Sequence, residues 1–196
     1  MYRIHHTEGL ILDGVAFGEA NKFLSVFTKD YGLIRASAQG LRRDASRLRY
    51  NLQDLTYAHI DLVFGRTGWR IVGASEIKNF AFLLLGCHDS WNICLRTTRL
   101  LRRLLHGEEK NKPLYDDVLR AFMFLLSPPT DKKKIFYIEM IVVMRILHHL
   151  GYLGDNALLI PYLSGTIEEG IYLPSVETIK SLALREINKS LQATQL

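Results

Sequence analysis

The sequence predicts an α+β protein, with a five-stranded β-barrel of the OB type followed by an all-α helical bundle. Two observations lead to this prediction. Up to residue 75, apolar and polar residues alternate in short runs bounded by glycine and aspartate, which is typical of half-buried strands. After residue 78 the apolar spacing becomes that of amphipathic helices. We therefore expect two domains, an OB-fold domain over residues 1–78 and a helical domain over residues 79–196.

Five strands are expected, and they cover residues 4–12, 23–28, 33–39, 55–64 and 69–74. In the first strand, one face would carry Ile4, His6, Glu8, Leu10 and Leu12. In the third, apolar Ile34, Ala36 and Ala38 alternate with polar residues. Five short strands so close together usually form a closed barrel, because an open sheet would expose two unpaired edges. An OB-type barrel is the leading candidate, and an SH3-like barrel is the next.

Four helices are expected in the second half, over residues 90–106, 113–126, 131–150 and 176–193. Pro113 stands in the first turn of the second helix, and the pair Pro128–Pro129 ends it. Gly151 is well placed to cap the third helix. Residues 161–174 are rich in glycine and acidic residues and are expected to form a loop.

The composition is that of a globular protein with a modest positive charge. Of the 196 residues, 48% are hydrophobic, which is enough for a packed core and argues against disorder. A net charge of +5 is compatible with an acidic partner but does not require one. The longest apolar stretch, residues 135–150, contains charged residues and is too short to span a bilayer. With no signal-peptide pattern at the start, we expect a cytoplasmic protein that does not bind membranes.

The search for a catalytic or metal site is negative. Cys87 and Cys94 are too few for a disulfide framework or a four-thiolate zinc site, and Cys94 is expected to be a buried thiol. The sequence contains no phosphate-binding glycine loop, nucleophile elbow or zinc-protease motif. We therefore expect no enzymatic activity, no metal and no cofactor.

A basic segment between the third and fourth strands is the strongest candidate for function. Arginine binds phosphate through a planar fork and also stacks on bases. A solvated basic loop is the alternative, but loops on OB-type barrels commonly bind oligonucleotides. Tyr50, Tyr57 and Trp69 are candidate stacking rings, although aromatic residues at strand spacing usually belong to the core. The basic candidates in this part of the chain are Arg35, Arg42, Arg43, Arg47, Arg49, Arg66 and Arg70.

A second basic stripe lies on the first long helix, where Arg96, Arg99 and Arg103 recur on one face. Such a stripe opposite a leucine face is usually the solvent side of an amphipathic helix. Otherwise it is a contact surface for DNA or for an acidic peptide. The run Lys132–Lys134 allows the same two interpretations, and its position at a helix start is electrostatically unfavourable.

The order of several short motifs resembles the RecO family of bacterial recombination mediators. Over the first 75 residues the matching segments are collinear, and a later segment fits an RLLxxLGY-like motif of the family. The matching segments are 8–12, 18–22, 27–28, 32–35, 40–43, 46–49, 52–53, 145–147 and 150–152. The basic positions that match the family's motif are Lys22, Arg35, Arg42, Arg43, Arg47 and Arg49.

The resemblance implies an OB-fold and a helical domain, with single- and double-stranded DNA bound mainly on the barrel. It also implies annealing of complementary strands and, with RecR, loading of RecA onto DNA coated by single-stranded-DNA-binding protein (SSB). Many family members carry a four-cysteine zinc module after the LGY segment, whereas residues 153–172 contain no cysteine, so no zinc site is expected.

Several assignments remain open from the sequence. The stripe Arg96, Arg99 and Arg103 is the hypothesis for a surface that binds the acidic tail of SSB. The alternatives to a recombination mediator are an OB-fold RNA-binding protein and a helical protein-interaction scaffold with an incidental basic loop. A nuclease is disfavoured because the sequence has no acidic cluster to hold a metal.

Overall fold

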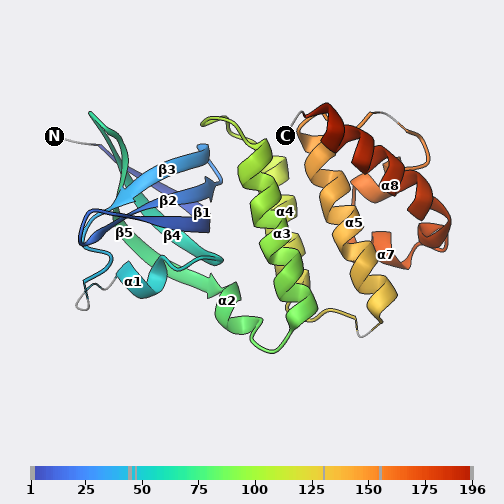
Figure 1. Ribbon diagram of the computed structural model, residues 1–196, viewed down its shortest axis with the longest axis horizontal. Coiled ribbons are helices and arrows are strands. Elements are labelled where there is room, and N and C mark those ends of the chain that lie inside the picture. Colours follow the sequence, from blue (N-terminus) through green and yellow to red (C-terminus); the bar gives the residue numbers. More distant parts are fainter. Residues whose placement is uncertain (1–2, 44–45, 47, 130, 155, 195–196) are drawn as a thin grey trace. The chain divides into compact units, whose positions relative to one another are not determined.

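The computed structural model describes residues 3–43, 46, 48–129, 131–154 and 156–194 (Figure 1). Strands dominate the first part of the chain and helices the second, which confirms the predicted α+β class. The chain divides into two compact units. A barrel unit comprises residues 1–85 and 105–112, and a helical unit comprises residues 86–104 and 113–196. The domain limits 1–78 and 79–196 stay a prediction.

The strands of the barrel unit are β1 (Ile4–Phe17), β2 (Asn21–Thr28), β3 (Gly32–Ala38), β4 (Thr56–Gly65) and β5 (Gly68–Asn79). They close in the order β1-β2-β3-β5-β4, and β4 pairs again with β1. All neighbours are antiparallel except β3 and β5, which are parallel. Each strand is therefore paired on both sides. This closed order confirms the predicted OB-type barrel.

The barrel interior is filled by alternate side chains from all five strands. The predicted inward face of β3, with Ile34, Ala36 and Ala38, is confirmed. In β1 the interior residue is Ile11, so the face that begins at Ile4 and His6 is the outer one. Residues 10–12 are all buried apolar residues, and such a run hides which face of a strand points inward. A β-bulge in β1 then shifts the alternation before its second half.

A short helix, α1 (Leu48–Asn51), lies between β3 and β4, within the segment that the sequence predicts as a loop. The Asn51 side chain donates a hydrogen bond of 2.8 Å to the Ala74 carbonyl oxygen of β5. On either side of α1, Leu41 and Leu52 enter the barrel core. After β5, helix α2 (Phe80–Leu83) begins with an Asn79 cap. The basic segment is thus fastened to the barrel at several points.

Residues 105–112 return to the barrel unit after the first long helix. Gly32 has a φ of +65°, and a Cβ atom at this position would overlap the backbone of Glu109. Next to it, the Lys110 ammonium donates to the Asp30 carboxylate at 2.9 Å. This hydrogen bond, together with one from the Thr7 hydroxyl, holds the pKa of Asp30 below its ordinary value. Glycine is required at this turn both by its conformation and by the close approach of the returning segment.

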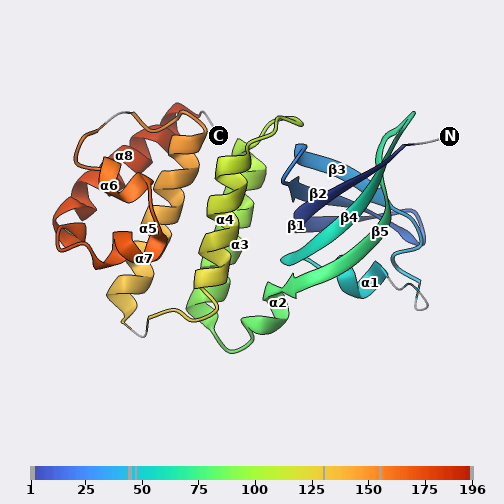
Figure 2. The ribbon, with the colours of Figure 1, turned by 180° about the vertical axis from the view of Figure 1, so that it is seen from behind.

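The helical unit contains α3 (His88–Leu104), α4 (Lys112–Phe124), α5 (Lys132–His149), α6 (Ile160–Leu163), α7 (Ile167–Tyr172) and α8 (Val176–Ala193). The four predicted helices correspond to α3, α4, α5 and α8, with small differences at their ends. Helix α5 contacts α3, α6, α7 and α8, and the rear view shows it between α3 and α8 (Figure 2). Among the described residues, no helix is both long and apolar enough to cross a membrane.

The prediction of a loop over residues 161–174 is wrong, because α6 and α7 lie there. The Thr166 hydroxyl accepts a bond from the Glu169 amide, and the Glu169 carboxylate accepts one from the Thr166 amide, so α7 begins with a capping box. Tyr162, Ile167 and Ile171 are buried and hold these short helices in place. Helices of four and six residues are too short to show a helical period in the sequence.

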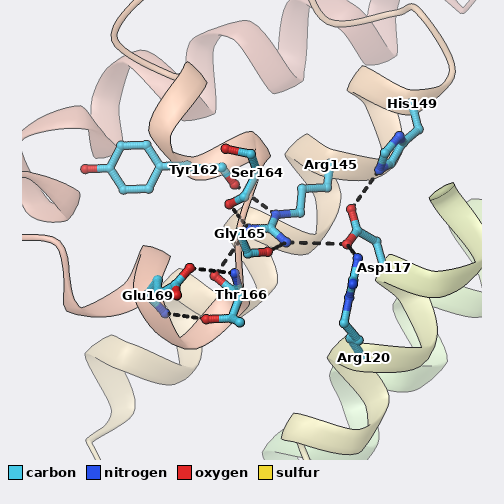
Figure 3. A network of polar contacts seen from close by, with 9 residues as sticks. All are labelled: Asp117, Arg120, Arg145, His149, Tyr162, Ser164, Gly165, Thr166 and Glu169. Atoms are coloured by element: carbon cyan, nitrogen blue, oxygen red, sulfur yellow. Dashed lines mark hydrogen bonds and ion pairs between the residues drawn. The ribbon is translucent and has the colours of Figure 1, made fainter.

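Arg145 of α5 fastens the α6–α7 connection to the rest of the unit (Figure 3). It is only 2% exposed, and its guanidinium donates to four backbone carbonyl oxygens, the longest of these bonds being from Nη2 to Thr166 at 3.3 Å. Nε donates to Tyr162 at 2.9 Å, Nη1 to Gly165 at 3.0 Å and Nη2 to Ser164 at 2.7 Å. A planar fork of donors suits this set of acceptors, which a lysine could not match.

The counter-charge of Arg145 is Asp117 of α4, at 3.5 Å (Figure 3). Asp117 also accepts hydrogen bonds from Arg120 at 2.6 Å and from His149 at 2.7 Å. Burial raises the pKa of Asp117, but these hydrogen bonds and the charge of Arg145 outweigh it, so the pKa lies below its ordinary value. Burial also lowers the pKa of Arg145. The network joins α4, α5 and the α6–α7 connection.

Candidate nucleic-acid interface

An open cavity of about 580 Å³ lies beside α1 and the start of β2. Three of the predicted DNA-binding residues line it: Lys22, Arg42 and Arg49. Its other walls come from Gln53, Asp54 and two leucines of the barrel core. Cations from a strand, a loop and a helix therefore line one open hollow.

The loop after β3 is bonded to the β1–β2 turn. The Arg42 amide donates to the Ala20 carbonyl oxygen at 3.0 Å, and the Arg42 guanidinium donates to the Gly18 carbonyl oxygen at 3.2 Å. In addition, the Gly40 amide donates to the Asn21 side chain at 2.9 Å. Arg42 is exposed but held in place, as a binding residue on a rigid barrel should be. Arg43 is also exposed, and Arg47 lies outside the described residues.

A second basic group lies around the β4–β5 turn. Arg66 and Arg70 are exposed and line a cavity of about 200 Å³ that also includes Ser37 of β3. Ser37 pairs with Arg70 in the parallel β3–β5 ladder. Arg35 lies two residues earlier on the same outer face of β3 and is exposed. In OB-folds, oligonucleotides bind across the β2–β3 face and the β1–β2 and β4–β5 turns, which is where these cations lie.

The stacking hypothesis is wrong for two of the three predicted rings. Trp69 packs in the barrel interior, and Tyr57 is buried with its hydroxyl donating to the Glu8 carboxylate at 2.7 Å. That hydrogen bond holds the pKa of Glu8 below its ordinary value. Tyr50 of α1 is 65% exposed. Strand spacing alone does not tell an outward ring from an inward one.

Two phenylalanines that the sequence analysis missed lie on the outer face of β1 and β2. The ring centroids of Phe17 and Phe23 are 4.7 Å apart, with an interplanar angle of 42°. The guanidinium carbon of Arg35 lies 4.7 Å from the centroid of Phe23. Phe17 is 49% exposed, although it is the last residue of a strand in a well-packed barrel. Its position directly before the Gly18 turn is the only sequence signal that could have suggested exposure.

The basic stripe on α3 is not uniform. The Nε and Nη2 atoms of Arg96 both donate to the Glu139 carboxylate of α5, with Nη2 donating to Oε2 at 2.8 Å. The hydrogen bonds from Arg96 to Glu139 raise the pKa of Arg96. Arg99 and Arg103 are exposed. Arg96 therefore joins two helices although 52% of its side chain is exposed, whereas Arg99 and Arg103 are exposed on the same face of α3.

The lysines at the start of α5 also have structural contacts. Lys133 lies 3.6 Å from the Glu177 carboxylate, and the Lys134 ammonium lies 4.2 Å from the centre of the Tyr172 ring. The Asp131 side chain caps the helix by accepting a hydrogen bond from the Lys133 amide. The acidic cap offsets the unfavourable position of three lysines at a helix start.

The described residues contain no group of three or more histidine, cysteine, aspartate or glutamate side chains arranged to hold a metal ion. Cys87 is exposed, whereas Cys94 is buried, as predicted. Burial raises the pKa of the Cys94 thiol to about 12. A thiol that keeps its proton is a poor metal ligand and a poor nucleophile.

Comparison with known proteins identifies the family. Residues 1–78 match the family described as recombination protein O, N-terminal. The chain is 32% identical to the DNA repair protein RecO of Heliobacterium modesticaldum over 156 residues, which are 80% of this chain and 55% of that relative. Residues 1–78 therefore have the sequence of a RecO N-terminal domain, which agrees with the closed OB-type order of their strands.

Other RecO proteins match over a similar part of the chain. Identity is 26% over 155 residues with the DNA repair protein RecO of Thermodesulfovibrio yellowstonii, covering 77% of this chain and 59% of the relative. It is 28% over 152 residues with the DNA repair protein RecO of Halalkalibacterium halodurans, covering 72% and 56%. Each match thus spans little more than half the length of the curated relative.

Proposed function

We propose that this RecO-family chain binds DNA through its barrel and acts in recombinational DNA repair without changing DNA chemically. The observation that carries the proposal is the meeting of Lys22, Arg42 and Arg49 around one cavity of an OB-type barrel. Contacts from lysine and arginine to phosphate position a strand without reading its bases. Binding is therefore expected to be largely independent of sequence. The DNA-binding residues proposed are Lys22, Arg35, Arg42, Arg43, Arg47, Arg49, Arg66 and Arg70.

The resemblance to recombination mediators extends this proposal. Both single- and double-stranded DNA are expected to bind, because both present phosphates to the same cations. The biochemical role would be annealing of complementary strands and, with RecR, loading of RecA onto SSB-coated single strands. The working location would be the cytoplasm, at the nucleoid.

The test is DNA binding across a salt series. Wild type is compared with a variant that carries Arg42→Ala, Arg43→Ala, Arg47→Ala and Arg49→Ala, using fluorescence anisotropy of a labelled single-stranded oligonucleotide. Each lost phosphate contact removes about 0.7 from the slope of log affinity against log salt, so four losses flatten it by up to about 3. Binding should weaken to a similar degree for oligonucleotides of different sequence.

A matched control keeps the loss of charge but moves it to the helical unit. The variant Lys132→Ala, Lys180→Ala, Arg185→Ala and Lys189→Ala removes four exposed cations there. It should keep a slope close to that of wild type. An equal loss in both variants would mean that net charge, and not the basic segment, drives binding. Tighter binding of an RNA oligonucleotide of the same sequence would instead indicate an RNA-binding protein.

We also propose that Arg99 and Arg103 of α3 bind the acidic tail of SSB. Both are exposed and lie one helical turn apart on one face. The variant Arg99→Glu with Arg103→Glu should abolish binding of an acidic tail peptide while leaving the α3–α5 ion pair of Arg96 with Glu139 intact. Unchanged peptide affinity would exclude this surface.

A further inference from the structure

We propose that Phe17 is a base-stacking platform through which the barrel favours unpaired over paired DNA. This inference rests on the proposed DNA-binding function and concerns the same surface. The ligand of the Phe17 ring would be an exposed nucleobase of a single strand. This role is separate from the phosphate contacts proposed for the lysine and the arginines.

The first step is the geometry of the ring. Phe17 ends β1 on its outer face, where Val15 pairs with Phe23 and Phe17 with Asn21 in the β1–β2 ladder. Phe17 and Phe23 are therefore diagonal neighbours, and their centroids lie 4.7 Å apart. The contact supports Phe17 from one side while 49% of the residue stays exposed. A supported ring loses less conformational entropy when a base stacks on it.

The second step is the charge around the ring. Arg35 lies over Phe23, and the Arg42 guanidinium donates to the carbonyl oxygen of Gly18, the residue that follows Phe17. Lys22 is the second residue of β2 and lines the same cavity as Arg42. An isolated exposed phenylalanine needs no special explanation. A supported ring with cations nearby on β2, on β3 and in the loop after β3 matches the combination used to bind single strands, a basic groove with aromatic stacking surfaces.

The third step is the discrimination between strands. Phosphates are present in both single and double strands, so the arginines and lysines serve both. A protein ring can stack only on a base whose face is accessible, and in a duplex both faces of each internal base are covered by neighbouring pairs. Stacking on Phe17 therefore adds affinity for single strands alone.

The experiment compares Phe17→Leu with wild type on a labelled oligo-dT and on a blunt duplex of equal length, at one fixed salt concentration. Leucine keeps an apolar side chain but has no aromatic face. Single-strand affinity should fall about 5- to 150-fold, as the loss of one stacked base implies, while duplex affinity and the salt slope stay unchanged. The control is Phe82→Leu, which changes an exposed phenylalanine of α2 and should affect neither ligand.

A second variant, Phe17→Trp, keeps the stacking surface and adds a spectroscopic probe. It should bind oligo-dT at least as tightly as wild type, and the added tryptophan fluorescence should be quenched by oligo-dT but not by duplex. Equal binding of oligo-dT by wild type and Phe17→Leu, with no quenching in Phe17→Trp, would overturn the stacking role and leave the proposed function intact. Failure of wild type to bind either ligand at low salt would overturn both.

Discussion

The buried guanidinium of Arg145 offers the sharpest test of how the helical unit is held together. In Arg145→Met, the carbonyl oxygens of Tyr162, Ser164 and Gly165 lose their donors, and Asp117 loses its buried counter-charge. Methionine fills much of the volume but satisfies none of these groups. Removing one partner from a buried, hydrogen-bonded charge pair typically costs about 3–5 kcal/mol, and we expect a loss of that size in the free energy of unfolding.

The assay uses the two tryptophans, because Trp69 lies in the barrel and Trp91 in α3. In a Trp69→Phe background, tryptophan fluorescence reports on the helical unit alone. For a unit with an m-value of about 1–3 kcal/mol per molar urea, the unfolding midpoint should fall by about 1 M or more. Hydrogen exchange in α6 and α7 should accelerate most, because Arg145 bonds directly to their connection.

The matched control is Arg120→Met, which removes another hydrogen bond to Asp117 from a side chain that is 62% exposed. An exposed pair of this kind contributes at most about 1 kcal/mol. If Arg145→Met proves no more destabilising than Arg120→Met, the role assigned to the buried network is wrong.

Three further predictions concern other parts of the chain. Gly32→Ala should lower the free energy of unfolding of the barrel by about 2 kcal/mol or more, because φ is positive at this position and the new Cβ would overlap the returning segment. Gly18→Ala has a similar φ but open space around it and should cost about 1 kcal/mol. Thermal unfolding of the two variants measures the difference. A thiol reagent should label one cysteine of the native protein, Cys87, and reach Cys94 only after unfolding, because Cys94 is buried with a pKa of about 12; rapid labelling of both in the native state would contradict this. Asp117→Asn should lower stability at pH 6, and the difference from wild type should shrink as pH falls below about 4, because a carboxylate with a depressed pKa stabilises the fold only while it is ionised; a difference that stays constant down to pH 3 would refute the assignment.

The sequence was sufficient for the strands whose two faces differ in polarity. In β3, Ile34, Ala36 and Ala38 face inward as the alternation predicts. It did not decide which face of β1 points inward, because a period of two disappears when consecutive residues are all buried. It failed again in α6 and α7, which are fixed by tertiary contacts to Arg145 and by a capping box rather than by an amphipathic period.

For the candidate interface, the residue types were predictable but their grouping was not. The basic segment suggested arginine–phosphate contacts, yet only the closed barrel brings Lys22 together with Arg42 and Arg49. Nor does the sequence show that Phe17, at the end of a strand, stays exposed on one side while Phe23 supports it on the other. Likewise, the α3 stripe reads as uniform in sequence, whereas α5 supplies the carboxylate that engages Arg96.

The return of residues 105–112 to the barrel unit bears on how the chain is built during translation. All five strands leave the ribosome before α3, but the segment that covers Gly32 and pairs Lys110 with Asp30 follows α3. In the nascent barrel, the turn at Gly32 therefore stays uncovered until α3, the first helix of the helical unit, has been synthesised. The contacts of the barrel can be completed only after α3 has emerged. Every chain with a complete barrel has therefore already begun to synthesise its helical unit.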